Sequence, residues 1–432
     1  MITDYSTTRL RGVALCIVCT ALLCVGCDSG GRATVRFWCG FTGPDGRTML
    51  RMIQAFNEEN PDACALMQRM DWGTYYNKLF VAGLGGRAPE VFITHVENME
   101  RFFQAGFLDA IDDLVDGAAG VDTDDFFPYV WGAVERDGLH YGLPLDVHPQ
   151  GLFYNKRLFR EAGIVDEAGD ALPPTDRESF MDALTTLTRD TTGDGRTDQW
   201  GFVFTWLRTN MATVTRQFGS TYFTPDFDRC VLTDDATVAA FSFCADLIQR
   251  GLVPSPEHFD AWIGFRQGRV AMAFEGIYML ADLEKQSDLE WGAAPLPVLG
   301  DRPAAWASSH VMCLRAGLDP ETRAAAWRLM RFLSDNMLDW AEGGQVPARH
   351  SQIDSARFQN MYAQAAFARQ MDYIAYMPPV PFIFEFFSEF DRAAERVLRA
   401  SASAVDALRE AEQKVNVAIE RQRRLTEAGG GP

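Results

Sequence analysis

The stretch TVRFWCGFTGPDGRTMLRMIQAFNEENPDACALMQR, residues 34–69, decides the fold class. It opens with a β-rich run at 34–38, after which a Thr-Gly-Pro signal starts a helix. Apolar residues then recur at helical spacing until an Asn-Pro pair ends the helix, and the run at 64–69 predicts a second strand. This strand–helix–strand order predicts parallel strands joined by crossover helices.

The same alternation continues along the chain. A second helix is expected at 73–86, a third strand at 89–93 and a third helix at 98–106. Residues 150–305 again mix helices with short strands, and the C-terminal segment from 390 predicts one or two long helices packed on the body. The sequence therefore predicts an α/β protein.

Size and charge narrow the classes of function. A chain of 432 residues can hold two domains or one large bilobal unit, and 47% hydrophobic with 23% charged residues is a globular composition. The formal net charge is −19. A nucleic acid or an anionic membrane surface would be repelled, so neither is expected as a partner.

The N-terminus predicts export. Arg9 and Arg11 precede an apolar run at 13–26, which is too short for a comfortable membrane span and typical of a signal-peptide core. Gly26 and Cys27 then resemble the end of a bacterial lipobox, so residues 1–27 are expected to be a signal peptide and Cys27 the lipidation site. A plain signal peptide or an uncleaved anchor remains the alternative.

No metal site or cofactor is expected from the sequence. Five cysteines follow residue 27, they are widely scattered, and none lies in a CxxC or histidine-flanked cluster. Because five is odd, at least one thiol stays unpaired, and a role as a small buried hydrophobe is expected for most of them.

Six segments carry a resemblance to a known family. They are VRFWCGFTGPDG…MIQAFNEENP (35–61), GLGGRAPEVFIT (83–94), YGLPLDVHPQGLFYNKRLFREAGI (141–164), LPPTDRESFMDALTTLT (172–188), FRQGRVAMAFEGIYML (265–280) and GGQVPARHS (343–351). In this order and spacing they resemble the extracellular solute-binding proteins of ABC importers, in their maltose-binding-like, carbohydrate-type branch. Asp176 and Tyr278 stand where that family usually has Trp, which leaves the specific sugar open.

The resemblance implies a fold and a function. The fold is the type II periplasmic-binding-protein-like one, with two α/β lobes joined by three crossings and the ligand in the cleft between them. The N-terminal lobe would comprise 34–145 and 311–345, and the C-terminal lobe 146–310 and 346–427. The function would be that of a monomeric, non-enzymatic subunit that binds a mono- or oligosaccharide or a polyol and delivers it to the ABC permease in the membrane.

The tripeptide Tyr154-Asn155-Lys156 repeats an earlier one at 76–78. The first lies within an expected helix and the second follows an extended, proline-containing segment, so the two do not indicate an internal repeat. A catalytic tyrosine–lysine pair would need a cofactor, and the sequence has no glycine-rich phosphate loop. By the resemblance, the second tripeptide is expected to be scaffold at the start of a helix.

A sugar site needs flat aromatic faces for stacking and acids, amides or Arg for its hydroxyls. Residues of these kinds at expected strand ends, crossings and loops are the candidates, and Tyr278 is the single best one. For Trp72 a role in the core is the alternative, and for Asp146 a structural ion pair is. The candidate ligand-binding residues are Phe41, Thr42, Trp72, Thr94, His95, Glu97, Asp146, His148, Trp206, Trp262, Glu275, Tyr278, Trp306, His310 and Arg349.

Two other functions stay open at this point. An exported carbohydrate-active enzyme would share an aromatic-rich cleft with paired carboxylates, although the sequence has no GxSxG, no HExxH and no convincing acid pair. A surface lipoprotein could also bind a solute or another protein as a sensor or adhesin.

Overall fold

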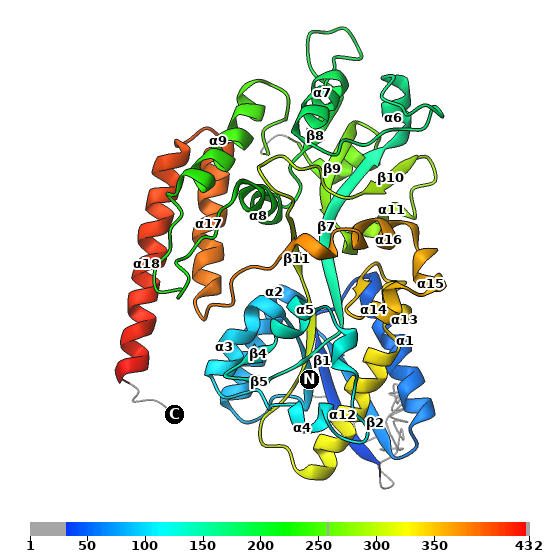
Figure 1. Ribbon diagram of the computed structural model, residues 1–432, viewed down its shortest axis with the longest axis vertical. Coiled ribbons are helices and arrows are strands. Elements are labelled where there is room, and N and C mark those ends of the chain that lie inside the picture. The colour runs from blue at the N-terminus through cyan, green and yellow to red at the C-terminus, as the bar shows by residue number, and fades with distance from the viewer. Residues whose placement is uncertain (1–31, 257–258, 429–432) are drawn as a thin grey trace, which may run out of the picture.

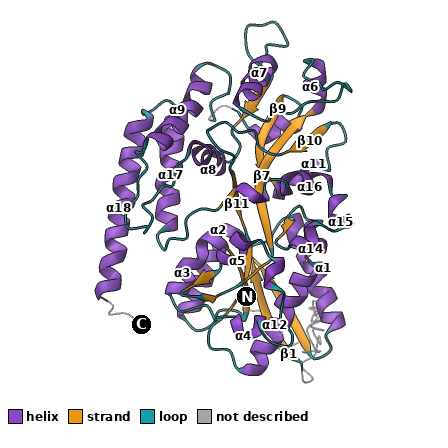
Figure 2. Ribbon diagram, viewed as in Figure 1, coloured by secondary structure: helices purple, strands orange, loops and turns teal. Residues whose placement is uncertain are grey.

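The computed structural model describes residues 32–256 and 259–428 and has two lobes, each built on a β-sheet with helices around it (Figure 1). The predicted signal peptide and Cys27 lie outside the described residues. Strands run through the middle of both lobes and helices lie on the outside (Figure 2). No helix in the described part of the chain combines the length and the apolar character that crossing a membrane requires.

The first lobe contains a five-stranded sheet in the order β2-β1-β3-β12-β6. β1 pairs in parallel with both β2 and β3, whereas β12 is antiparallel to β3 and to β6. The strands are β1 (Ala33–Cys39), β2 (Ala63–Arg69), β3 (Val91–His95), β6 (Leu143–Pro144) and β12 (His310–Leu314), and a separate hairpin joins β4 (Glu135–Arg136) to β5 (Leu139–His140). A segment late in the chain thus completes the first sheet.

The helices that pack on this sheet come from two separate stretches of the chain, one before β6 and one after β12. They are α1 (Pro44–Glu59), α2 (Trp72–Leu84), α3 (Met99–Gln104), α4 (Asp112–Val115), α5 (Pro128–Gly132), α12 (Pro320–Asp335) and α13 (Met337–Ala341), with 3₁₀ turns η1 (Val96–Asn98) and η2 (Thr123–Asp125). The apolar side chains of α1, α4, α5, α12 and α13 share one buried core with β1 and β3, and those of α2 and α3 pack in a second cluster with β3 and β12. α1 begins with Pro44 at its first position, where a missing N–H costs nothing.

The second lobe contains a seven-stranded sheet arranged around β7. Its main path is β14-β11-β7-β9-β8, and β10 and β13 also pair with β7. All ten residues of β7 are buried, so it is the central strand of this lobe. The strands are β7 (Asp146–Asn155), β8 (Trp200–Val203), β9 (Val270–Gly276), β10 (Trp291–Ala294), β11 (Ala305–Ser308), β13 (Val346–Pro347) and β14 (Ile374–Ala375).

Helices cover this sheet and extend past it. They are α6 (Lys156–Glu161), α7 (Arg177–Leu187), α8 (Leu207–Phe218), α9 (Asp235–Gln249), α10 (Ala261–Arg266), α11 (Leu280–Leu283), α16 (Tyr362–Ala368), α17 (Ile383–Leu398) and α18 (Ala404–Ala428), with α14 (His350–Ile353) and α15 (Ala356–Gln359) leading from β13 to α16, and 3₁₀ turns η3 (Ile277–Met279) and η4 (Met371–Tyr373). The predicted C-terminal helical segment is thus two helices, α17 and α18.

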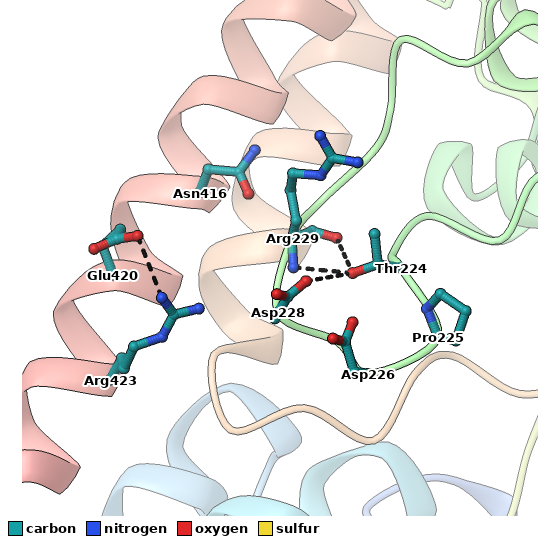
Figure 3. A pocket seen from close by; sticks show the side chains of 8 residues that line it. All are labelled: Thr224, Pro225, Asp226, Asp228, Arg229, Asn416, Glu420 and Arg423. Atoms are coloured by element: carbon teal, nitrogen blue, oxygen red, sulfur yellow. Dashed lines mark hydrogen bonds and ion pairs between the residues drawn. The ribbon is translucent and has the colours of Figure 1, made fainter.

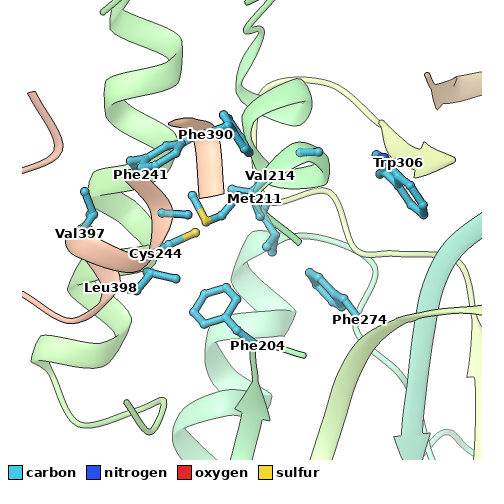
Figure 4. Packing of buried hydrophobic residues seen from close by; sticks show 14 of the residues in the cluster. Phe204, Met211, Val214, Phe241, Cys244, Phe274, Trp306, Phe390, Val397 and Leu398 are labelled. Carbon is cyan, nitrogen blue, oxygen red and sulfur yellow. The ribbon is translucent and has the colours of Figure 1, made fainter. Parts of the chain in front are cut away.

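The core of the second lobe lies between the sheet and these helices. Phe241 of α9 meets Phe390 of α17 edge to face, with ring centroids 5.6 Å apart. In Figure 4, Met211 and Val214 of α8 lie between these rings and Trp306 of β11.

The elements near the N-terminus follow the sequence prediction closely, with one shift. The third strand spans 91–95 rather than the predicted 89–93. Pro89 has no N–H to donate to a ladder, and the backbone N–H of Arg36 on β1 donates to the Glu90 carboxylate rather than to a backbone carbonyl. The shift places His95 at the end of the strand.

The described cysteines with free thiols are buried. They are Cys39, Cys230, Cys244 and Cys313. Burial raises the pKa of the Cys39 thiol to about 12, so this side chain stays protonated and acts as a small apolar group, as predicted.

Candidate functional site

The candidate site lies where the two sheets approach each other, a region called the interlobe junction here. It is formed by the end of β3, the start of β7, the start of β12, and the ends of β9 and β11. Strand pairing fixes its geometry, because His310 of β12 lies opposite His95 of β3, and Ser308 of β11 lies opposite His148 of β7. Only Ser309 lies between Ser308 and His310, so the short step from β11 to β12 carries the chain from the second sheet to the first and brings the two pairs together.

Asp146 is the centre of hydrogen bonding at the junction. Its carboxylate is fully buried and accepts bonds from the backbone N–H and Nδ1 of His310, at 3.1 and 2.7 Å, and from Nδ1 of His148 at 3.0 Å. Nε1 of Trp340 donates a fourth bond at 2.5 Å. Burial alone would raise the pKa of Asp146, but the charge of His310 and the bonds from both histidines outweigh it and hold that pKa well below its usual range.

Three histidine rings gather beside this carboxylate. The ring centroids of His148 and His310 lie 4.3 Å apart, and those of His95 and His310 lie 4.9 Å apart. The Tyr76 hydroxyl makes a short contact with Nδ1 of His95. Burial and the neighbouring histidines lower the pKa of His95 well below its ordinary value, and the same causes lower that of His148. One nitrogen from each ring could serve as a metal ligand.

An aromatic wall covers the junction from the first lobe. Trp72 stacks on Tyr76 and on His310, with ring centroids 5.6 and 5.8 Å apart. Phe41 is fully buried behind it and contacts both His310 and Trp340. Gly40 lets Trp72 approach, since a Cβ there would stand 2.1 Å from the indole ring.

The wall from the second lobe carries polar atoms with no partner. Oε2 of Glu275 and Nε1 of Trp306 are buried and lack a hydrogen bond within the part of the chain that the structure describes, and so does Oδ1 of Asn210. Burial raises the pKa of Glu275 to about 8, although the N–H of Gly276 donates to its Oε1. Glu275 and Trp306 were predicted from the sequence. Asn210 was not, because it lies inside α8, where a polar residue carries no signal of a site.

The remaining predicted residues differ in how close they come to the histidines. Glu97 accepts a 2.5 Å bond from Ser308 Oγ, and Thr94 is buried beside Val311 in the β3–β12 ladder. Tyr278 packs near His148, with ring centroids 6.4 Å apart. Trp206 is 55% exposed and precedes the first residue of α8, next to Glu275. Thr42 is exposed, and no contact between it and the three histidines occurs in the described part of the chain.

Two predicted residues are not brought to the junction. Trp262 stacks on Phe265 and donates from Nε1 to Asp282 at 2.9 Å, in a separate apolar cluster. Arg349 pairs with Asp125 at 2.8 Å and with Asp335 at 3.2 Å. Both side chains have partners where they are, and those partners hold them away from the histidines.

The structure also brings in residues that the sequence did not single out. Tyr76, Trp340 and Gln150 line the junction, and Tyr376 joins it through a short contact with the Ser309 hydroxyl. Tyr76 lies in the first Tyr-Asn-Lys tripeptide, within α2. A helical aromatic of this kind carries no sequence signal that distinguishes a site from a core.

The second Tyr-Asn-Lys tripeptide lies at the opposite end of β7 from Asp146. Tyr154 and Asn155 end the strand, and Asn155 accepts a 3.1 Å bond from the N–H of Leu158 as the N-cap of α6. The prediction that it starts a helix is confirmed.

A second candidate is a surface hollow lined mainly by charged side chains. It lies between α18 and the loop of residues 224–229, and Figure 3 shows its side chains bonded to one another, including Glu420 to Arg423 and Thr224 to Asp228. Its lining is mostly exposed and charged, and it does not include Glu275, Trp306 or Asn210, whose buried polar atoms lack partners in the described chain. The interlobe junction is therefore the better candidate site.

Comparisons with known proteins agree with this architecture. The family model described as a bacterial extracellular solute-binding protein matches residues 51–366. The maltotriose-binding protein of Pyrococcus abyssi is 22% identical over 319 residues, which cover 71% of this chain and 64% of that protein, so the chain spans less than two thirds of its length. A putative binding protein of Brucella abortus is 23% identical over 373 residues, which cover 81% of this chain and 84% of that protein.

Solved structures share the fold. The ABC substrate-binding protein of Listeria monocytogenes in complex with cycloalternan superposes with a TM-score of 0.78 at 19% identity, covering 90% of this chain and 99% of that one. The sugar-binding protein MalE from Xanthomonas citri gives 0.78 at 22% identity, covering 91% and 99%. The predicted two-lobed, type II fold is confirmed. Because the family model spans well over half of the sequence, this chain belongs to the bacterial extracellular solute-binding proteins.

Proposed function

We propose that this protein is the lipid-anchored solute-binding subunit of an ABC importer, which binds a carbohydrate at the interlobe junction and delivers it to the permease. Membership of the extracellular solute-binding family already makes it an exported protein that binds a solute and is not an enzyme. The earlier alternative of a carbohydrate-active enzyme is thereby removed. The proposal adds three points to this: the solute is a carbohydrate, the protein is anchored by a lipid, and it delivers the solute to the permease.

One observation carries the sugar assignment. Glu275 and Trp306 present a buried carboxyl oxygen and a buried indole N–H with no partner among the described residues. Leaving such groups unpaired costs about 1–3 kcal/mol each. A ligand that donates and accepts at neighbouring atoms removes this cost, and the hydroxyls of a sugar do both.

The surrounding rings suit the apolar faces of a sugar. Tyr278 and Trp306 from the second lobe flank His148, with ring centroids 6.4 and 6.3 Å from it. Trp72 and Tyr76 stand on the first lobe. Sugar rings stack their C–H faces on such side chains while acids and amides bind the hydroxyls.

The relatives support a carbohydrate as the cargo. The Pyrococcus abyssi relative is a maltotriose-binding protein, and the Listeria monocytogenes structure holds cycloalternan. Both ligands are sugars, and the same kind of ligand fits the aromatic and polar groups at the junction. Neither name fixes which sugar this chain takes.

Entry of the ligand requires the lobes to separate. Asp146 is fully buried and Trp306 is only 9% exposed, so a sugar could reach them only if the lobes moved apart. Two lobes that rotate about strands such as β7 can open to admit a solute and close to exclude water. A permease would then recognise the closed, loaded form.

The anchor is proposed on sequence alone. Cys27 follows an apolar run at 13–26 and Gly26, in a lipobox-like arrangement. Mass spectrometry of the membrane fraction should find an N-terminal peptide that begins at Cys27 and carries acyl chains. An unmodified chain beginning at another residue would remove the anchor and leave the binding function intact.

A thermal-shift screen of the purified protein against sugars, polyols and their phosphates tests the binding function. A ligand at one hundred times its Kd adds about 2.7 kcal/mol to stability. Since each kcal/mol raises the midpoint by about 2–4 °C in a domain of this size, a cognate sugar should give a shift of several degrees. The bound sugar should be recovered unchanged. A panel with no shift would contradict the sugar assignment, and uptake that does not depend on the protein would contradict delivery.

A further inference from the structure

Three histidines from distant parts of the chain meet at the interlobe junction. His95 ends β3, His148 lies near the start of β7 and His310 begins β12. One ring nitrogen from each lies within 4.8 Å of the other two. We propose that these three side chains hold a divalent transition-metal ion of the zinc class. The proposal goes beyond sugar binding and does not depend on it.

The hydrogen bonds of the three rings leave one nitrogen of each for a ligand. Nδ1 of His148 and Nδ1 of His310 bind the two oxygens of Asp146, and Nδ1 of His95 contacts the Tyr76 hydroxyl. Nε2 is therefore the nitrogen that remains on each ring. A carboxylate on the far nitrogen of a ligating histidine is the usual outer-shell arrangement in metal sites, where it fixes the tautomer and the ring orientation.

The backbone holds the three positions firmly. His95 and His310 are directly opposed in the antiparallel β3–β12 ladder, and His148 is opposed to Ser308, two residues before His310. Directly opposed residues have Cβ atoms about 4.5–5.5 Å apart. Sites built on strands are placed more reproducibly than sites on loops.

The donor set selects the class of ion. Imidazole nitrogen suits zinc, copper, nickel and iron, whereas calcium and magnesium prefer oxygen ligands. Three protein ligands with a fourth position open are typical of accessible zinc sites. Zinc–nitrogen bonds of about 2.0–2.1 Å place tetrahedral ligand atoms roughly 3.3 Å apart, so the rings must close in slightly on the ion. His95 keeps part of its surface exposed, whereas His148 and His310 are buried, so it is the least enclosed of the three rings.

A simpler role for the histidines, as partners of a buried carboxylate, does not account for all three. Asp146 already receives bonds from His148, His310 and Trp340. His95 makes none of these bonds, yet its ring stands 4.9 Å from that of His310. A metal ion explains why a third imidazole is brought to the same place, and the Asp146 charge would partly balance the charge of the ion.

Zinc titration of the full-length protein tests the proposal. The protein is stripped with a chelator and titrated calorimetrically with ZnCl₂ in the absence of sugar, for the wild type, His95→Gln and His140→Gln. His140 is the matched control, because its Nδ1 also binds a carboxylate, that of Asp112 at 2.8 Å, but it lies outside the cluster. Since His95 is half-buried, its variant is the one best placed to fold normally, and circular dichroism checks this.

We expect one zinc ion per wild-type chain and the same affinity in His140→Gln. Loss of a direct ligand should weaken binding in His95→Gln by more than the roughly 10–100-fold that outer-shell changes cost. Co²⁺ bound to the wild type should show the visible absorption of a four-coordinate site. Zinc should also protect histidines of the wild type from diethyl pyrocarbonate, a check that needs no variant. Absence of saturable zinc binding, or equal affinity in wild type and His95→Gln, would overturn the proposal.

Discussion

At the scale of single residues, the buried polar groups of the junction differ in how fully they are hydrogen-bonded. Asp146 receives four hydrogen bonds and has a lowered pKa, whereas Glu275 keeps one oxygen without a partner in the described chain and has a raised pKa. The first arrangement is that of a structural carboxylate. The second is typical of a ligand-binding group, because a buried polar atom without a hydrogen bond costs free energy, and a ligand that pairs with it removes that cost.

The raised pKa of Glu275 predicts a specific pH dependence of stability. Burial raises it from 4.5 to about 8, so the folded protein holds a proton that the unfolded chain releases above about pH 4.5. This contribution is fully present below the unfolded pKa and is lost as the pH rises through 8. Without ligand, the free energy of unfolding should therefore fall between pH 5 and 8, by up to about 1.4 kcal/mol per pH unit from this group.

Urea unfolding of wild type and Glu275→Gln at several pH values measures this effect. The amide does not titrate, so the variant should lose this part of the slope. Glu161→Gln, on the exposed face of α6, is the control and should keep the wild-type slope. Parallel curves for wild type and Glu275→Gln would mean that the carboxyl is not held protonated in the folded state.

At the scale of elements, the two Tyr-Asn-Lys tripeptides have different roles that a matched pair of variants can separate. Asn155 caps α6 and is buried, whereas Asn77 is exposed in the middle of α2. Asn155→Ala removes a cap and should cost about 1 kcal/mol or more, whereas Asn77→Ala should be neutral or slightly stabilising because alanine favours helices. Chemical denaturation measures both, and equal effects would contradict the cap.

The sequence predicted elements well where local chemistry decides them. The Thr-Gly-Pro and Asn-Pro signals bracket α1 to within two residues, because a proline at the first turn and a helix stop act locally. The junction depends on pairing across the chain instead. His95 and His310 are 215 positions apart and become neighbours only through the β3–β12 register, so no spacing in the sequence could reveal the histidine cluster.

The same difference between local signals and long-range packing explains which site residues could be predicted from the sequence. His95 was predicted because it follows an apolar run, and Glu275 and Tyr278 because their segment resembles the one where the family places a ligand-facing aromatic. Trp262 was predicted as a stacking residue next to that segment, but in the structure its indole donates to Asp282 in a separate apolar cluster. Trp340 was missed because it lies in a helix whose contact with Asp146 is set by tertiary packing. The division into lobes at particular residues stays a prediction.

At the scale of the whole molecule, a small contact joins α17 of the second lobe to α2 and α3 of the first lobe. Phe384 of α17 lies 6.0 Å from Tyr76 of α2, measured between ring centroids, and Arg101 of α3 stands over the same ring at 5.5 Å. Aromatic pairs add about 0.5–1.5 kcal/mol beyond their buried area. Phe384→Ala should therefore favour the open form, raise the radius of gyration of the sugar-free protein and weaken sugar binding by several-fold.

Small-angle X-ray scattering and calorimetry on the same samples measure these two effects. Phe227→Ala is the control, because Phe227 is exposed to a similar extent but contacts Phe223 within its own lobe. It should leave both the radius and the affinity unchanged. An unchanged radius and affinity in Phe384→Ala would show that this contact does not hold the lobes together.

The most direct test of sugar binding at the junction is a calorimetric titration of the best sugar from the screen into wild type, Trp306→Phe and Trp262→Phe. Both variants keep an aromatic ring and lose an indole N–H, which has no partner at Trp306 among the described residues and donates to Asp282 at Trp262. We expect Trp306→Phe to weaken sugar binding by about tenfold or more at little cost in stability, and Trp262→Phe to keep the wild-type affinity and lose about 1 kcal/mol of stability. Wild-type affinity in Trp306→Phe, with a loss of affinity in Trp262→Phe, would mean that the sugar does not bind at the interlobe junction.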